Sequence, residues 1–113
     1  MSGEKLEKLM KIKGAIAACH FTADGKLLEH KGDIPREIVE MAAKVFAANN
    51  MMAQTQLEAL TALAKAKFAP LLSWAVAGGD FLICVAGHYG VVVKLSEADL
   101  NLIYKELSEV AKG

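Results

Sequence analysis

The sequence predicts an α+β fold in which five antiparallel strands form one sheet with helices on both faces. Three observations lead to this prediction. The hydrophobic spacing alternates between helical and strand-like in the order α-β-β-α-β-β-β-α. Turn signals separate short apolar runs, first around Asp24-Gly25 and later between residues 71 and 95. Neither the hairpin nor the later meander can bury enough apolar surface alone, so we expect them to join.

Length and composition indicate one domain over residues 1–113. The chain is 54% hydrophobic and 23% charged, which excludes a disordered protein. Its 13 Lys and Arg residues balance its 13 Asp and Glu residues, so the net charge is zero. A nucleic-acid or anionic-membrane partner would need a basic surface, so neither is expected. The same neutrality leaves association between copies of the chain unopposed.

The first elements are a short helix and a hairpin. The segment Glu4–Ile12 has apolar residues at helical spacing, which predicts an amphipathic helix that lies on a sheet. An apolar strand over Ala15–Thr22 then turns at Asp24-Gly25, a strong hairpin signal, into a return strand over Lys26–Lys31. The charges on this return strand are typical of an exposed sheet edge.

The next element is a long helix over residues 35–67, which we expect to extend through Phe68. No Gly or Pro interrupts it, and good helix formers dominate. The sequence leaves open whether it is one helix or two joined near Asn49-Asn50. The opposite side carries few charges, so part of it should be covered too. One stripe gathers Ile38, Met41, Ala42, Val45, Asn49, Met52, Ala53, Gln56, Leu60, Leu63 and Ala64.

The last part of the chain predicts a three-stranded meander and a final helix. The strands are Leu71–Ala77, Phe81–Ala86 and Val91–Leu95, and glycine-containing turns separate them. Their runs are apolar on both sides, as expected for a sheet that is covered on both faces. The final helix should begin at Ser96 as N-cap. Its apolar stripe is Leu100, Ile103, Leu107 and Val110.

One stretch of the chain is similar to a known family. The residues Lys11-Ile12-Lys13-Gly14-Ala15-Ile16-Ala17-Ala18, which run into Asp24-Gly25-Lys26-Leu27-Leu28, resemble the first hairpin of the roadblock/dynein light chain family. That family has a profilin-like fold with the same order of elements. The whole chain is also similar to uncharacterised bacterial roadblock-like proteins of this size.

The resemblance implies a sheet order of 2-1-5-4-3, in which the strand Leu71–Ala77 lies at one edge. Roadblock-like domains form dimers by pairing this edge and packing their long helices side by side. Their usual roles are scaffolding and regulation of small Ras-like GTPases, without catalytic groups of their own. The long helix predicted for this chain is extended relative to that pattern, which puts the detailed interface geometry in question.

The uncharged edge supports a dimer independently of the resemblance. The segment Phe68–Gly79 has no charged residue, and Leu72, Trp74 and Val76 share one side of the predicted strand. Natural monomers avoid such an edge because it invites strand addition. We therefore expect an isologous homodimer through strand 71–77 and helix 35–67. The alternative is that Trp74 fills the core of a monomer and the edge is merely short.

Two amides within the apolar stripe are further interface candidates. Asn49 and Gln56 stand seven residues apart, and a polar residue at such a position can fix the register of paired helices. We expect them to form hydrogen bonds near the dimer seam. The alternative is that they bond to the sheet backbone or to solvent.

No group of residues predicts catalysis, a cofactor or a metal. Cys19 and His20 are adjacent in a strand and point to opposite faces, so they cannot form a nucleophile–base pair. His20, His30 and His88 lack metal-ligand spacing. The glycine turns lead into strands, whereas phosphate-binding loops lead into helices. Cys19 and Cys84 lie in apolar runs, which indicates two buried thiols in a reducing cytoplasm.

The sequence therefore predicts a non-enzymatic homodimeric scaffold or regulatory protein that binds a partner protein. The resemblance implies a small Ras-like GTPase or another roadblock-like chain as this partner. The alternative is a profilin-like sensor or carrier of a small ligand, with a cavity between sheet and long helix that Met52, Trp74 and Cys84 line. The uncharged runs are too short and too interrupted to span a bilayer, so a soluble, cytoplasmic protein is expected.

Overall fold

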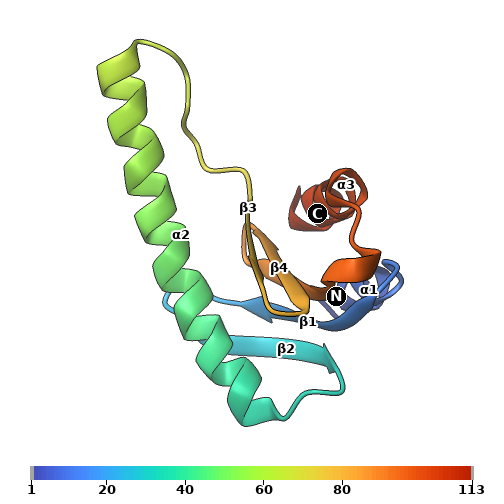
Figure 1. The fold of residues 1–113 in the computed structure, drawn as a ribbon. Helices are drawn as coiled ribbons and strands as arrows, with labels where there is room; N and C mark the ends of the chain where they lie inside the picture. Colours follow the sequence, from blue (N-terminus) through green and yellow to red (C-terminus); the bar gives the residue numbers. More distant parts are fainter. Residues whose placement is uncertain (1, 113) are drawn as a thin grey trace.

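The computed structural model describes residues 2–112 and confirms the predicted α+β architecture (Figure 1). All strand pairs are antiparallel, and the sheet order is β2-β1-β5-β4-β3. The elements are α1 (Ser2–Met10), β1 (Ala15–Phe21), β2 (Leu27–Gly32), α2 (Arg36–Ala64), β3 (Trp74–Gly78), β4 (Phe81–Ala86), β5 (Tyr89–Lys94), the short 3-10 helix η1 (Leu95–Glu97) and α3 (Leu100–Lys112).

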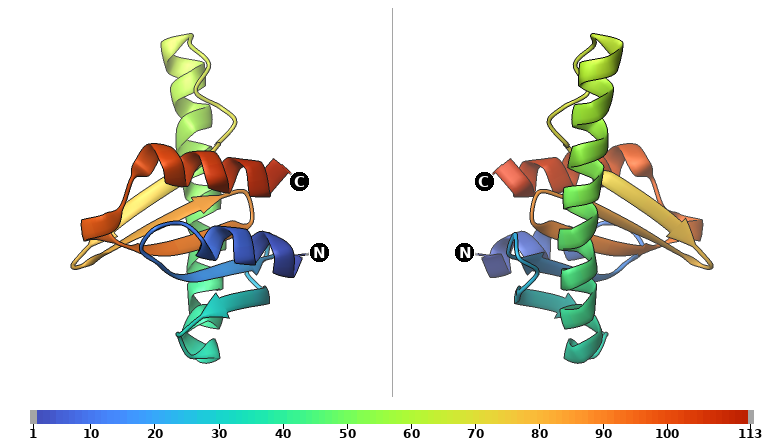
Figure 2. Two further views of the ribbon diagram at one scale, coloured as in Figure 1. Left: turned by 90° about the vertical axis from the view of Figure 1, so that its right-hand side faces the viewer. Right: turned by 90° about the vertical axis from the view of Figure 1, so that its left-hand side faces the viewer.

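Helices cover the two faces of the sheet unequally. Figure 2 shows α1 and α3 side by side on one face and α2 alone across the other. Two apolar cores follow from this arrangement. The core under α1 and α3 includes Leu6, Leu9, Cys84, Ile103 and Leu107. The core under α2 comprises Cys19, Phe21, Val39, Ala43, Phe46, Ala47 and Val85.

Helix α2 is one continuous helix of 29 residues, without a break at Asn49-Asn50. At a rise of about 1.5 Å per residue it is about 43 Å long, which matches the 43 Å long axis of the molecule. Its first half contacts β2 and β1. Its last turns extend beyond the β3 edge of the sheet, as the views in Figure 2 show.

Two glycines allow α2 to approach the sheet closely. A Cβ atom on Gly90 of β5 would lie 3.1 Å from the Phe46 ring. Gly25 has a φ of 88° in the predicted hairpin turn, and a Cβ atom there would lie 3.0 Å from Lys44 Cα. The turn of the first hairpin therefore also forms part of the surface on which α2 packs.

The predicted end of α2 is wrong by several residues. The helix ends at Ala64, not at Lys67 or Phe68, because Lys65 adopts a left-handed φ of 57°. The chain then turns back along the helix. The Thr61 hydroxyl accepts hydrogen bonds from the backbone N–H groups of Phe68, at 3.0 Å, and Ala69, at 3.1 Å. These bonds replace the next helical turn.

The later strands and the last helix also differ in their bounds. Strand β3 begins at Trp74, not at Leu71, so Leu72 lies outside it. Strand β5 begins at Tyr89, since the turn before it is only two residues long. Ser96 belongs to η1 and does not cap α3. Instead Asp99 Oδ1 accepts a hydrogen bond from the Leu102 N–H at 3.3 Å, so α3 begins at Leu100.

Candidate interaction surface at strand β3 and helix α2

The two edges of the sheet have opposite chemical character. Strand β2 carries Glu29, His30 and Lys31, and Lys31 forms an ion pair with Glu7 of α1 at 3.2 Å. Strand β3 has the sequence WAVAG, and four of its five residues are exposed. It pairs with β4 alone, for example Val76 with Ile83. The N–H and C=O groups on its outer side therefore point away from the sheet. The strand carries no charged side chain that would oppose pairing with another strand.

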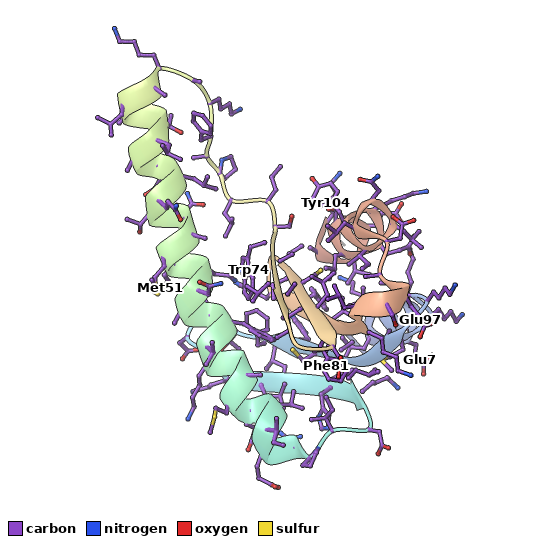
Figure 3. The ribbon with its side chains drawn as sticks, in the orientation of Figure 1. Glu7, Met51, Trp74, Phe81, Glu97 and Tyr104 are labelled. Atoms are coloured by element: carbon purple, nitrogen blue, oxygen red, sulfur yellow. The ribbon has the colours of Figure 1, made fainter. Side chains whose placement is uncertain are left out.

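Trp74 lies inside the chain's own fold more than the sequence argument expected. Its indole meets the Phe46 ring edge-on, with centroids 5.7 Å apart. Its Nε1 donates a hydrogen bond to Asn50 Oδ1 at 2.6 Å. Figure 3 shows Trp74 between β3 and α2. The half-buried indole thus packs against the core under α2, in line with the alternative that Trp74 fills the core of its own chain. Val76, in contrast, remains 50% exposed.

Leu72 is exposed on the segment that connects α2 to β3. Its side chain is 64% accessible, and with Leu71 it borders a shallow hollow beside Tyr104 and Lys105 of α3. It therefore does not share a strand face with Trp74 and Val76. Any contribution of Leu72 to an interface must come from this connecting segment.

The apolar stripe of α2 lies beside the residues that pack on the sheet, and its first members, including Ile38, Met41 and Val45, border a groove between α2 and the sheet. Asn49 is half-buried and Gln56 is exposed. The residues that pack on the sheet are instead Val39, Ala43, Phe46 and Ala47. Exposed large side chains of the stripe include Ile38, Met41, Val45, Met52, Leu60 and Leu63. The sequence correctly grouped the stripe on one side, but its large side chains stay exposed within the described chain.

Asn50 and Gln54 are the amides that form hydrogen bonds between α2 and the rest of the chain. The sequence argument missed both. Asn50 accepts from Trp74 and donates through Nδ2 to the Gly87 carbonyl at 3.0 Å. Gln54 Oε1 accepts from the Leu71 N–H at 2.7 Å. The two stand four residues apart, which places them on one side of the helix. The four-residue spacing could have predicted that these two amides bond to the rest of the chain only if the side of α2 that faces the sheet had been known.

An apolar groove, the α2 groove, runs between the stripe of α2 and the sheet. It has a volume of about 360 Å³. Its walls are almost entirely apolar, because side chains of α2 meet small and aliphatic residues of β1, β4 and β5. The lining includes Ile38, Met41, Ala42, Val45, Phe46, Ala17, Cys19, Ile83 and Val92. Such a groove next to an uncharged sheet edge is typical of a protein-interaction surface.

The second half of α2 and the connection after it form a projection, which we call the α2 arm (residues 51–73). The hydrogen bonds of Thr61 and Gln54 hold the helical part of the arm and the connecting segment together. Met51, labelled in Figure 3, points away from the sheet at its base. Leu63 near its end is 82% exposed. The arm presents apolar side chains that its own chain does not cover.

The cavity that the carrier alternative requires is not present in the predicted form. Met52 is exposed, and Cys84 belongs to the core under α1 and α3, on the opposite face from Trp74. These three residues therefore do not line one cavity. The α2 groove is a different space with different walls.

The potential catalytic groups lie in unreactive settings. Burial raises the pKa of the Cys19 and Cys84 thiols to about 11, although a backbone hydrogen bond from Gly90 lowers that of Cys19. His20 stacks on Tyr89 with ring centroids 4.2 Å apart. Among residues 2–112, no three His, Cys, Asp or Glu side chains come together to hold a metal. Nor, within that range, does a helix have the length and apolarity needed to cross a membrane.

Comparisons with known proteins agree with this architecture. Residues 5–109 match the family described as uncharacterized conserved protein DUF2173, and no curated protein matches. A roadblock/LC7 domain of Streptomyces avermitilis has a TM-score of 0.76 at 15% identity, over 99% of this chain and 88% of that one. The gliding protein MglB of Thermus thermophilus has a TM-score of 0.68 at 20% identity, over 98% and 88%. A structure described as MglB with tetrameric arrangement has a TM-score of 0.67, with the same identity and coverage. The predicted roadblock-like fold is thereby confirmed.

Proposed function

Because the chain belongs to the uncharacterised conserved family DUF2173 and has a roadblock-like fold, we propose that it is a non-enzymatic homodimeric scaffold or regulator. The proposal rests on two features that occur together. Strand β3 is an uncharged edge of the sheet, and the apolar stripe of α2 is exposed. Strand addition at β3 would satisfy its outer backbone groups. The stripe that includes Asn49 and Gln56 would be covered at the same time.

The chemistry of the chain supports a binding role over a catalytic one. The two thiols are buried with raised pKa values, and His20 is stacked on a tyrosine. The apolar groove offers area for a protein surface but few polar groups to orient a substrate. Self-association is also a property of a protein of this fold, since one MglB structure is described as tetrameric.

A charge placed on the β3 edge tests the homodimer. Val76→Lys should convert the dimer to a monomer in size-exclusion chromatography with light scattering, because lysine on an edge opposes strand pairing. Leu28→Lys on the opposite edge is the matched control, since Leu28 and Val76 are both 50% exposed. Val76 is preferable to Trp74 because the indole also supports the fold. A monomeric wild type, or equal masses for both variants, would refute the proposal.

The partner class that we propose is a small Ras-like GTPase, as the resemblance to roadblock-like domains implies. The test uses purified Ras-like GTPases from the same organism, loaded with GDP or a non-hydrolysable GTP analogue. Binding to the wild-type dimer should be measurable by calorimetry and should be weaker with Val76→Lys. Binding of none of them, or equal binding by both forms, would remove the GTPase from the proposal and leave another roadblock-like chain as the partner to test.

A further inference from the structure

Helix α3 leaves part of its own side of the sheet uncovered. It packs on β4 and β5, and β3 follows β4 at the edge of the sheet. Ala75 and Ala77 of β3 pair with Cys84 and Leu82, which belong to the core under α1 and α3. Directly paired residues share a side of a sheet, so these alanines face the side of α3. Both are exposed, which gives this side of β3 a smooth apolar surface.

A hollow of about 530 Å³ lies at one end of this surface, between α3 and the connecting segment that precedes β3. Leu72 borders the hollow on the connecting segment, and Tyr104, labelled in Figure 3, borders it on α3. Both side chains are exposed. Ala86 and Ala111 also line the hollow, so its walls are mostly apolar. Its volume falls in the range of sites that accept a ligand.

The cations beside the hollow have no partner in the described chain. Lys105 and Lys112 of α3 border it and are exposed, and neither forms an ion pair within residues 2–112. Glu109, the one acidic residue among the described residues that line the hollow, is paired with Lys8 at 3.3 Å. The hollow therefore combines apolar walls with two uncompensated positive charges, although the chain as a whole is neutral.

The two lysines are spaced for a helical ligand. Lys105 and Lys112 are seven residues apart, which is about two turns, so they project from the same side of α3 about 10.5 Å apart along its axis. A helix that lies beside α3 can match them with two carboxylates that are also seven residues apart. Residues three or four positions after the first carboxylate share that side of the ligand helix. Apolar side chains there would lie next to the hollow.

We propose that this surface binds an acidic amphipathic helix of a partner protein. Apolar side chains of that helix fill the hollow between Leu72 and Tyr104, and its carboxylates pair with Lys105 and Lys112. This is the recognition mode in which a helix lies in an apolar groove. Two cations are too few for firm attachment to a bilayer or a nucleic acid. We name the surface the α3 shelf, and its residues are Leu72, Ala75, Ala77, Tyr104, Lys105 and Lys112.

The α3 shelf is separate from the proposed dimer surface. Pairing through β3 would use the outer backbone groups of that strand, and α2 lies on the other face of the sheet. Ala75 and Ala77 would therefore stay free on the side of α3. The inference does not depend on the homodimer, and it adds a second binding surface to the chain.

Selection from a phage-displayed library of random peptides, each as long as α3, tests the α3 shelf. The library is first depleted on the double variant Lys105→Glu/Lys112→Glu and is then captured on wild type. The expected result is a family of peptides with two acidic residues seven positions apart and apolar residues between them. A selection that enriches no peptide, or only peptides without the paired acidic residues, would overturn the inference.

Fluorescence polarisation of one enriched peptide then identifies its binding site. Leu72→Asn should raise the peptide's Kd about tenfold, because an amide replaces an apolar wall of the hollow. Leu28→Asn, on the exposed β2 edge, is the matched control and should leave the Kd near the wild-type value. The double change Lys13→Glu/Lys94→Glu should also leave it there, since it alters the net charge as much as the shelf variant but at exposed sites outside the shelf. Equal effects of Leu72→Asn and Leu28→Asn would contradict the inference.

Val76→Lys distinguishes the α3 shelf from the dimer surface. Val76 follows Ala75 in β3 and so faces the other side of the sheet. The variant should therefore bind the peptide with wild-type affinity, whether or not the wild type is a dimer. Loss of binding in Val76→Lys with unchanged binding in Leu72→Asn would place the peptide on the dimer surface and overturn the inference. A monomeric wild type that binds the peptide through Leu72 would refute the homodimer and support the shelf.

Discussion

The indole of Trp74 donates a hydrogen bond to the side-chain oxygen of Asn50 over 2.6 Å, which joins the first residue of β3 to the centre of α2. The amide nitrogen of Asn50 donates in turn to the Gly87 carbonyl in the β4–β5 turn. One side chain therefore holds the long helix to two neighbouring segments of the sheet. It fixes the point at which α2 leaves the sheet and becomes the arm.

Replacing this amide should destabilise the fold. Asn50→Ala leaves the indole N–H of Trp74 and the Gly87 carbonyl without their partner, which should lower the free energy of unfolding by about 1–3 kcal/mol. Urea denaturation followed by Trp74 fluorescence measures the change. Asn101→Ala on exposed α3 is the control and should cost less than about 0.5 kcal/mol. Equal losses for the two variants would show that the Asn50 bonds add no specific stability.

The adjacent amides show how far the sequence could predict this site. Periodicity placed Asn49 and Gln56 together on one side of the helix, and the structure confirms that grouping. It could not tell which side meets the sheet, because both sides of α2 are rich in Ala, Met and Leu. The side that packs inward is chosen by shape, as where Gly90 admits the Phe46 ring. The amides that bond α2 to the rest of the chain are therefore Asn50 and Gln54.

Element order was predictable because turn chemistry is local, whereas several boundaries depend on contacts distant in sequence. The hairpin at Asp24-Gly25 forms where expected. Helix α2 ends early because Thr61 bonds to backbone groups seven and eight residues later. Helix α3 begins after Asp99, since the preceding residues form η1. No periodicity in the sequence encodes these choices.

The Thr61 hydroxyl should control the stability of the α2 arm. Thr61→Val keeps the shape of the side chain but removes the acceptor for the Phe68 and Ala69 N–H groups. The connection should open more often, so trypsin should cleave after Lys65 or Lys67 several-fold faster. Thr55→Val is the matched control, because both hydroxyls also donate to a carbonyl four residues earlier at 2.9 Å. Equal cleavage rates in the two variants would contradict the assigned role.

The two native thiols should be unreactive in the folded protein. Burial raises the pKa values of Cys19 and Cys84 to about 11. At pH 8 only about one thiol in a thousand would then be ionised, and the thiolate is the reactive form. A thiol-specific disulfide reagent should label both cysteines quickly in urea and very slowly without it. An Asn101→Cys variant, at an exposed position of α3, should label quickly in either condition. Rapid labelling of native wild type would show that the thiols are accessible.

His20 occupies a cluster of titratable groups at one end of the sheet. It is the cross-strand neighbour of Glu29 on β2 and of Tyr89 on β5, and its ring stacks parallel to that of Tyr89. Lys5 of α1 lies 5.4 Å from the Tyr89 ring centroid. Desolvation, followed by His88 and more weakly Lys5, lowers the pKa of His20, while Glu29 raises it; the net direction is downward.

This lowered pKa predicts that acid destabilises the protein through His20. The unfolded chain binds a proton near the ordinary His pKa of about 6.5, whereas the folded chain binds it only at lower pH. The stabilisation from the neutral ring is therefore fully present above about pH 6.5 and is lost as the pH falls towards the native pKa of His20. His20→Phe keeps the stacked ring but cannot titrate, so its free energy of unfolding should fall less than that of wild type between pH 7.5 and pH 5. Leu28→Phe, an exposed change on β2 that removes no titratable group, should follow wild type. An equal fall in His20→Phe would assign the acid sensitivity to another group.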